Sequence, residues 1–253
     1  MYSIQRLIQF QLYSPALYSS VRWRPYGILF RNPLNVACYD ANHGVILDLS
    51  CDLPAALEDL ERFYRARCLP PRIHGGFLEG EKEALFPALQ ARGYRIEEPE
   101  ETALLLSAPC ALPEGPGFFI EHPRSLTMEF SALLVSGIGP WALEMTEALL
   151  CRRGCRAYAL RTRDGTLSAY GMVVRTDDCS YLQNVFTLPA YRRQGFCSAL
   201  LRHITAEHRA EYPGLPLYLT TTSEDALRLY EQAGFRPVEH PFPAWSASLP
   251  DES

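Results

Sequence analysis

The sequence predicts an α/β fold divided into two domains. Its 253 residues are 47% hydrophobic and 21% charged, a composition typical of globular proteins, and this excludes disordered, collagen-like and coiled-coil chains. Prolines and glycines cluster over 112–117 and predict a linker between halves of similar length. On both sides of it, short extended runs alternate with amphipathic helical stretches, which predicts mixed sheets covered by helices.

The half before the linker predicts a hairpin or meander, then two helices and two further strands. Apolar residues recur at three- and four-residue spacing from Leu57 to Tyr64, and two consecutive prolines end that helix. A second helix runs through Leu85 to Gly93. The expected strands are 27–30, 36–39, 45–49, 94–96 and 102–107.

The half after the linker predicts helices on a larger sheet. One long helical stretch, 126–151, is interrupted at 137–140, and a second helix covers 197–208. Ser223 caps a third helix, which Gly234 ends. The expected strands are 118–121, 155–162, 167–174, 181–187, 217–221 and the last strands, which begin at 235. Asp-Gly at 164–165 predicts a hairpin turn.

Charge and composition exclude several classes of partner. A net charge of -5 and a pI near 5.7 argue against nucleic acid and anionic membranes as partners. No run approaches the roughly 18 apolar residues that a membrane span needs, and polar residues interrupt the N-terminal region, so neither a membrane segment nor a signal peptide is expected. The eight cysteines are irregularly spaced, which predicts reduced thiols in a cytoplasmic protein.

No metal site is expected from the sequence. Cys151 and Cys155 could share a helix face, but no histidine lies nearby at ligand spacing. His122, His203 and His208 have no partner that the sequence identifies, so surface or capping roles are expected for them.

The most informative segment is 183–201, where a strand, a basic turn and an amphipathic helix follow one another directly. Arg192 and Arg193 precede Gly195, and the helix begins immediately afterwards. Unpaired backbone N–H groups then converge at the positive end of a helix dipole, which predicts a phosphate or pyrophosphate site. The alternative is an ordinary polar connection between a strand and a helix.

This segment resembles the acyl-CoA-binding motif of the GNAT superfamily of N-acetyltransferases, Q/R-x-x-G-x-G/A. Arg192 fills its first position and Gly195 its glycine, while Cys197 stands where the family prefers Gly or Ala. A second block, 217–223 followed by 229–235, resembles the downstream strand and the LYxxxGF helix end of the same superfamily. The resemblance covers roughly 117–245 and implies a mixed, mostly antiparallel sheet with helices on both faces.

The resemblance implies transfer of an acetyl group from acetyl-CoA to a primary amine of a small molecule, by direct attack in a ternary complex. It implies that parallel strands ending near Thr187 and Thr221 splay apart around the pantetheine arm. Tyr230 matches the family's general acid; the alternative is a packed aromatic. The residues expected to bind the cofactor are Val185, Phe186, Thr187, Arg192, Arg193, Gln194, Gly195, Phe196, Cys197 and Ser198.

The general base and the acceptor are left open by the sequence. Glu144, Glu147 and Gln183 are candidates for the base, although surface roles are expected for the two carboxylates. A non-catalytic acyl-CoA-binding sensor and a purely structural protein are the alternative functions, and a homodimer is compatible with the sequence.

A weak internal repeat predicts that the first half is a degenerate copy of the second. Gly93-Tyr94-Arg95 resembles Gly234-Phe235-Arg236, and the same offset without gaps places Pro54 opposite Gly195 and Leu89 opposite Tyr230. We therefore expect a degenerate GNAT-like domain at 1–115 that helps to shape the acceptor pocket and binds no CoA. The working domain is expected at 116–253, and this half by itself is expected to bind acetyl-CoA. Chance similarity of two α/β halves is the alternative.

Overall fold

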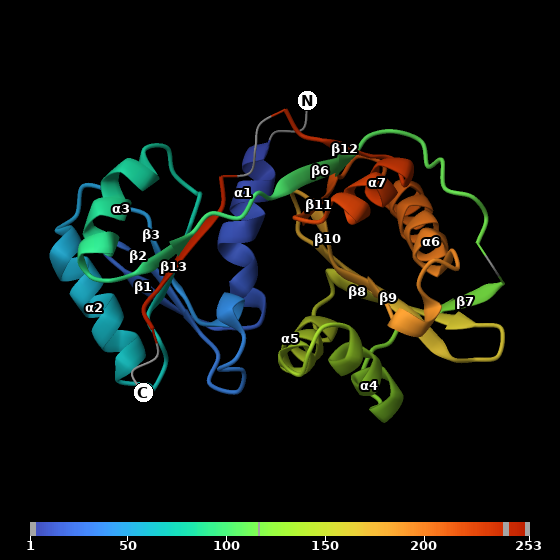
Figure 1. The fold of residues 1–253 in the computed structure, drawn as a ribbon, viewed down its shortest axis with the longest axis horizontal. Helices are drawn as coiled ribbons and strands as arrows, with labels where there is room; N and C mark the ends of the chain where they lie inside the picture. Colours follow the sequence, from blue (N-terminus) through green and yellow to red (C-terminus); the bar gives the residue numbers. More distant parts are fainter. Residues whose placement is uncertain (1–3, 116, 240–242, 251–253) are drawn as a thin grey trace. The chain divides into compact units, whose positions relative to one another are not determined.

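The computed structural model describes residues 4–115, 117–239 and 243–250. The chain forms two compact units, each built from two separate segments (Figure 1). Unit 1 comprises Met1–Phe10 and Thr102–Pro241, and unit 2 comprises Gln11–Glu101 and Phe242–Ser253. This grouping differs from the contiguous division at residue 115 expected from the sequence, because one strand from each half of the chain pairs in the sheet of the other half.

Unit 1 contains a seven-stranded sheet in the order β12-β6-β11-β10-β9-β8-β7. Neighbouring strands are antiparallel except β10 and β11, which are parallel. The strands are β6 (Thr102–Leu106), β7 (Phe118–Glu121), β8 (Cys155–Thr162), β9 (Leu167–Arg175), β10 (Ser180–Thr187), β11 (Leu217–Thr221) and β12 (Phe235–Pro237). The helices are α4 (Met128–Gly137), α5 (Trp141–Leu150), α6 (Phe196–Glu211) and α7 (Glu224–Gln232), with a 3-10 turn, η3 (Pro189–Tyr191).

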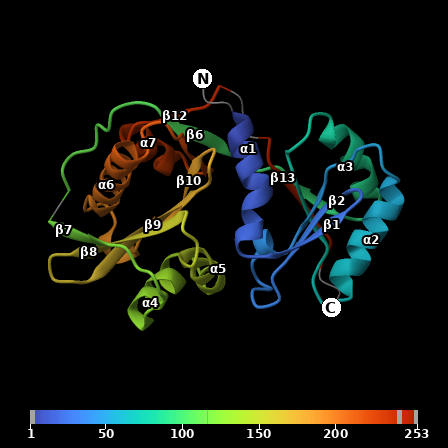
Figure 2. The same ribbon diagram turned by 180° about the vertical axis from the view of Figure 1, so that it is seen from behind.

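Helices cover both faces of this sheet (Figures 1 and 2). α6 contacts β8, β9 and β10, while α4 contacts β9 and α5 contacts β8 from the opposite face. Leu200, Leu201 and Ile204 on α6 are fully buried and pack with Leu160 and Leu182 of the sheet. The three helix residues recur at the spacing of one helical face, so the sequence pattern explains why α6 lies on the sheet in this way.

Unit 2 contains a six-stranded sheet in the order β1-β2-β3-β4-β13-β5. Leu57, Leu60 and Tyr64 of α2 pack with Leu29 and Ile46 on one face of the sheet. The strands are β1 (Ser20–Arg24), β2 (Gly27–Arg31), β3 (Gly44–Ile46), β4 (Arg72–Gly75), β5 (Arg95–Glu97) and β13 (Trp245–Ser248). The helices are α2 (Leu53–Arg65), α3 (Glu81–Ala91) and the later part of α1 (Ile4–Tyr13), with 3-10 turns η1 (Ser14–Leu17) and η2 (Tyr39–Ala41).

The two sheets have the same topology over six strands. In unit 2, β3 and β4 are the parallel pair and α2 follows β3, as α6 follows β10 in unit 1. β13 lies between β4 and β5, in the place that β6 takes between β11 and β12. Two copies of one α/β fold, each completed by a strand from the other half of the chain, confirm the predicted tandem arrangement.

The structure corrects several expected elements of unit 2. Residues 36–39 form turns and the start of η2, because the Asn42 side chain donates hydrogen bonds to the carbonyls of Asn35 (2.8 Å) and Cys38 (3.1 Å). α1, β1, β4 and β13 were not assigned from the sequence. Leu7 and Phe10 of α1 are buried, but the polar residues Gln9 and Gln11 between and beside them interrupt the apolar pattern that would have predicted this helix.

The start of α2 also changes how the two halves align. The N-cap of α2 is Asp52 and that of α6 is Gly195, so Asp52 stands where the sequence offset placed Pro54.

All eight cysteines are free thiols. Among the described residues, no helix is long and apolar enough to cross a bilayer.

Candidate functional site

The two parallel strands of unit 1 separate soon after they pair. β10 pairs with β11 only at Ser180↔Leu217 and Tyr181↔Tyr218. The hydroxyl groups of Tyr181 and Thr220 lie 2.7 Å apart and form a hydrogen bond just beyond the last pair. β10 then continues to Thr187 without further pairing to β11, so one edge of its backbone is open from 182 onward. This is the splay that the family resemblance implied.

A bulge in β10 accompanies the separation. Pairing with β9 shifts register between Gln183 and Phe186, and Asn184 has a φ of 56°. Asparagine tolerates the left-handed region better than most residues, which explains its place at this turn of the strand. Sequence reasoning missed the bulge and the Tyr181–Thr220 contact; an asparagine inside a strand was the available signal for the bulge.

The basic turn leads directly into the N-terminus of α6. Gly195 is the N-cap, with a φ of 84°, and the first helical hydrogen bond runs from the N–H of Ala199 to the carbonyl of Gly195 (2.9 Å). The N–H groups of Phe196, Cys197 and Ser198 precede that bond and therefore form the positive end of the helix dipole.

Side chains of the turn both shape it and supply charge. The Nε of Arg192 donates to the carbonyl of Thr187 (3.1 Å), and the Gln194 amide donates to the carbonyl of Ala190 (2.8 Å). Arg193 has a φ of 61° and, like Arg192, is exposed. Two arginines beside the first backbone N–H groups of the helix make this end of α6 a candidate anion-binding surface.

Several predicted cofactor residues contribute only their backbone. The Phe186 ring packs on Tyr170, with 5.6 Å between ring centroids, and Phe196 is buried against Tyr191. Val185 packs against the core, and Thr187 is buried. Backbone groups along the open edge of β10 are therefore what this strand can offer to an extended ligand.

Tyr230 lies on α7, whose start is fixed by a hydrogen bond from the N–H of Ala226 to the Ser223 hydroxyl (3.3 Å). Its side chain is buried and contacts Phe235 edge-on. Burial raises the pKa of the Tyr230 phenol, and Cys197 and Tyr181 add to the shift. Burial likewise raises the pKa of the Cys197 thiol. The phenol therefore stays protonated at neutral pH, next to the start of α6.

The three candidates for the general base differ in their surroundings. Gln183 is half-buried and its amide contacts the Met172 sulfur at 3.9 Å. On α5, Glu144 is half-buried and Glu147 is exposed. Their surroundings do not single out one of the three as the general base.

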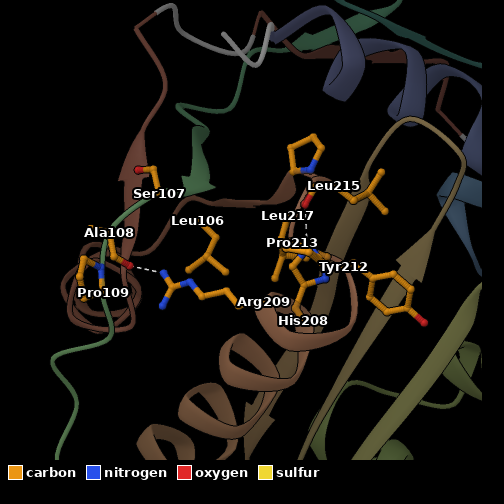
Figure 3. Close-up of a pocket in the computed structure, with 11 residues that line it drawn as sticks. Leu106, Ser107, Ala108, Pro109, His208, Arg209, Tyr212, Pro213, Leu215 and Leu217 are labelled. Atoms are coloured by element: carbon orange, nitrogen blue, oxygen red, sulfur yellow. Dashed lines mark hydrogen bonds between the residues drawn. The ribbon is translucent and has the colours of Figure 1, made fainter.

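A separate pocket lies at the opposite end of α6 (Figure 3). It has a volume of 470 Å³ and is lined mainly by prolines, leucines and the last turn of α6. Arg209 crosses it and donates to the carbonyl of Ala108. None of the predicted site residues lines this pocket.

In unit 2, the N-terminus of α2 occupies the place that corresponds to the anion-binding surface. Asp52 caps the helix by accepting from the N–H of Ala55 (3.2 Å). A pocket of 430 Å³ here includes Asp48, Asp52 and Asp59 in its lining, together with Arg24, whose Nε donates to Asp59 (2.8 Å). Three carboxylates against one arginine, with a helix N–H already bonded by Asp52, disfavour a phosphate.

Comparison with known proteins agrees with this geometry. Residues 153–237 match the model of the acetyltransferase (GNAT) domain. The sequence matches no curated protein. Among solved structures, a GCN5-related N-acetyltransferase from Kribbella flavida has a TM-score of 0.67 at 20% identity, over 99% of this chain and 96% of that chain.

Two further structures share the fold. A functionally unknown conserved protein from Staphylococcus epidermidis has a TM-score of 0.62 at 13% identity, over 92% of this chain and 93% of that chain. A tandem GNAT protein from the clavulanic acid biosynthesis pathway has a TM-score of 0.52 at 17% identity, over 77% of this chain and 69% of that chain. Residues 153–237 thus match the GNAT acetyltransferase domain, in a chain whose two units share the fold of these solved structures.

Proposed function

We propose that unit 1 transfers an acetyl group from acetyl-CoA to a primary amine of a small molecule, within a ternary complex. The observation that carries the proposal is the separation of β10 from β11, directly followed by the N-terminus of α6. An extended pantetheine arm fits the first feature, because the open edge of β10 can pair with it. A pyrophosphate fits the second, because backbone N–H groups and two arginines meet there.

The chemistry follows from groups at these two features. A backbone N–H at the open edge of β10, near Val185 or Thr187, donates to the thioester oxygen and stabilises the negative charge that develops there. The amine nitrogen attacks the thioester carbon, the C–S bond breaks, and the amine loses a proton to a base or to water. The Tyr230 phenol, which is protonated at neutral pH, donates a proton to the departing thiolate.

The test begins with calorimetric titration of acetyl-CoA into the wild-type protein and two variants. Gly195→Asp places a carboxylate where the pyrophosphate must approach, and Gly195→Asn imposes a similar side chain on the same positive φ without the charge. We expect at least about tenfold weaker binding for Gly195→Asp than for Gly195→Asn. Equal affinities of both variants and the wild type would contradict an anion site at α6.

Turnover is measured separately, as CoA released across a panel of small primary amines. Release should be followed by chromatography, because the eight protein thiols would react with a thiol reagent. Release that depends on both acetyl-CoA and an amine supports the transferase. Tight binding without release with any amine would instead favour the non-catalytic CoA-binding sensor.

A further inference from the structure

Two histidines and a glutamate of unit 1 converge on one point beside α6. The Glu207 Oε2 lies 3.3 Å from the Nε2 of His203 and 3.8 Å from the Nε2 of His122. One ligand atom from each of the three residues lies within 4.8 Å of the other two. Ligand atoms of a tetrahedral zinc ion, with bonds of about 2.0–2.1 Å, are separated by about 3.3 Å. The three residues are therefore close to the spacing of a metal-binding set.

The remaining polar atoms of these side chains are already held by the protein. The Nδ1 of His122 lies 3.0 Å from the carbonyl of Ala157, so a proton on Nδ1 is satisfied there and the lone pair of Nε2 faces Glu207. The other carboxylate oxygen of Glu207 accepts from the Tyr158 hydroxyl (2.6 Å) and from Arg156. Hydrogen bonds of this kind orient metal-binding histidines and carboxylates and leave the opposite atom free.

The Nε2 of His203 is poorly satisfied by the protein alone. This atom is shielded from solvent and faces the Glu207 Oε2 at 3.3 Å without hydrogen-bond geometry, and it makes no other hydrogen bond with the described residues. A shielded imidazole nitrogen without a hydrogen bond is unfavourable unless something else binds it. His208, one turn further along α6, shows the usual alternative, because its Nε2 lies 2.9 Å from the carbonyl of Leu215.

We propose that His122, His203 and Glu207 bind a divalent transition-metal ion of the zinc type, with water completing its coordination. His203 and Glu207 lie four residues apart on one face of α6, and His122 follows the end of β7. The ion would join α6 to the strand at the far edge of the sheet. The sequence alone gave these histidines no partner, because His122 is distant from the other two along the chain.

The experiment titrates CoCl2 into the full chain after removal of metal with a chelator, and follows visible absorption. Cobalt bound by nitrogen and oxygen gives weak visible bands, whereas thiolate ligands add intense near-ultraviolet bands, so the site is distinguished from the eight cysteines. We expect one cobalt ion without thiolate bands, displaced by ZnCl2. The melting temperature should rise with added zinc, because the ion binds the folded state.

Variants identify the ligands. His203→Ala and Glu207→Gln should each weaken cobalt binding at least tenfold, and His122→Asn, at an exposed position, provides a variant with little effect on folding. Glu211→Gln is the matched control: Glu211 lies one turn beyond Glu207 and also bonds Arg156, but it is outside the converging set. It should bind cobalt as the wild type does. Unchanged affinity in His122→Asn and His203→Ala, or equal loss in Glu211→Gln, would overturn the proposal.

Discussion

Tyr230 combines a packing role with the chemical role proposed for it. Its ring lies in the core between α6 and α7, edge-on to Phe235, and its burial raises the pKa of the phenol. The ring and the hydroxyl can be separated by mutation, because phenylalanine keeps the packing and removes only the proton donor.

Tyr230→Phe should therefore lower turnover by about 10²-fold while leaving the Kd for acetyl-CoA nearly unchanged. The defect should shrink with an acyl donor whose thiol is more acidic, since its thiolate leaves without a proton. Steady-state rates with both donors, with a melting curve for each protein, provide the measurement. A variant as active and as stable as the wild type would show that the proton comes from elsewhere, such as water.

His43 makes the stability of unit 2 depend on pH. It is buried, stacks on His74 with 4.0 Å between ring centroids, and its Nδ1 makes no hydrogen bond with the described residues. Burial lowers the pKa of His43 well below its ordinary value of 6.5, and His74 lowers it further. The folded unit thus holds a neutral imidazole that the unfolded chain can protonate.

Below pH 6.5 the unfolded chain binds more protons than the folded one, so the free energy of unfolding decreases as the pH is lowered. We expect a loss of up to about 1.4 kcal/mol per pH unit from His43. Urea unfolding at pH 7.5 and 5.5, followed by the fluorescence of buried Trp245 after replacement of Trp23 and Trp141 by Phe, measures it. His43→Gln should reduce the pH dependence; an unchanged dependence would assign it to other groups.

At the scale of elements, the helices α6 and α2 begin in opposite ways. α6 begins at a glycine with positive φ and leaves its first N–H groups free beside two arginines. α2 begins at Asp52, whose carboxylate accepts a hydrogen bond from one of the first N–H groups of α2. Asp48 and Asp59 line the adjacent pocket. The same position in two copies of the fold thus differs in charge.

We therefore expect one acetyl-CoA per chain, bound in unit 1. Calorimetry should give a stoichiometry near one, and Gly195→Asp should weaken that single site without revealing another. Two equivalents bound per wild-type chain, or a second equivalent that persists in Gly195→Asp, would refute a degenerate unit 2.

For the whole molecule, the exchange of strands sets where the chain can be divided. β6 pairs with both β11 and β12, and its Leu104 is fully buried in the core of unit 1. The segment 116–253 lacks β6, so it does not contain a complete sheet. The expectation that this segment alone binds acetyl-CoA therefore needs a different boundary.

A fragment of residues 102–241 retains every strand of unit 1 and should fold and bind acetyl-CoA. A fragment of 116–241 should lack cooperative unfolding, because β12 loses its neighbour and the backbone edge of β11 is left unpaired. Circular dichroism melting and calorimetry of both fragments test this. Equal folding and binding of the two would show that β6 is dispensable.

Local sequence was sufficient for most elements of both units. Helices α2 and α6 follow from apolar residues repeated on one face, and Ser223 marks the start of α7. The basic turn before Gly195 predicted an anion-binding helix N-terminus because neighbouring residues alone create it. Such signals are readable since they depend on backbone groups and side chains within a few residues.

The tertiary structure decided what depends on distant pairing. β13 completes unit 2 and β6 completes unit 1 through hydrogen bonds between strands far apart in the chain, which no local pattern encodes. Residues 36–39 turn instead of pairing because the Asn42 side chain donates to the carbonyls of Asn35 and Cys38. His122 meets His203 and Glu207 only after β7 and α6 are packed in one unit. The sequence by itself determined the helices and the charged turn, whereas long-range hydrogen bonding and packing decided the exchanged strands and the converging side chains.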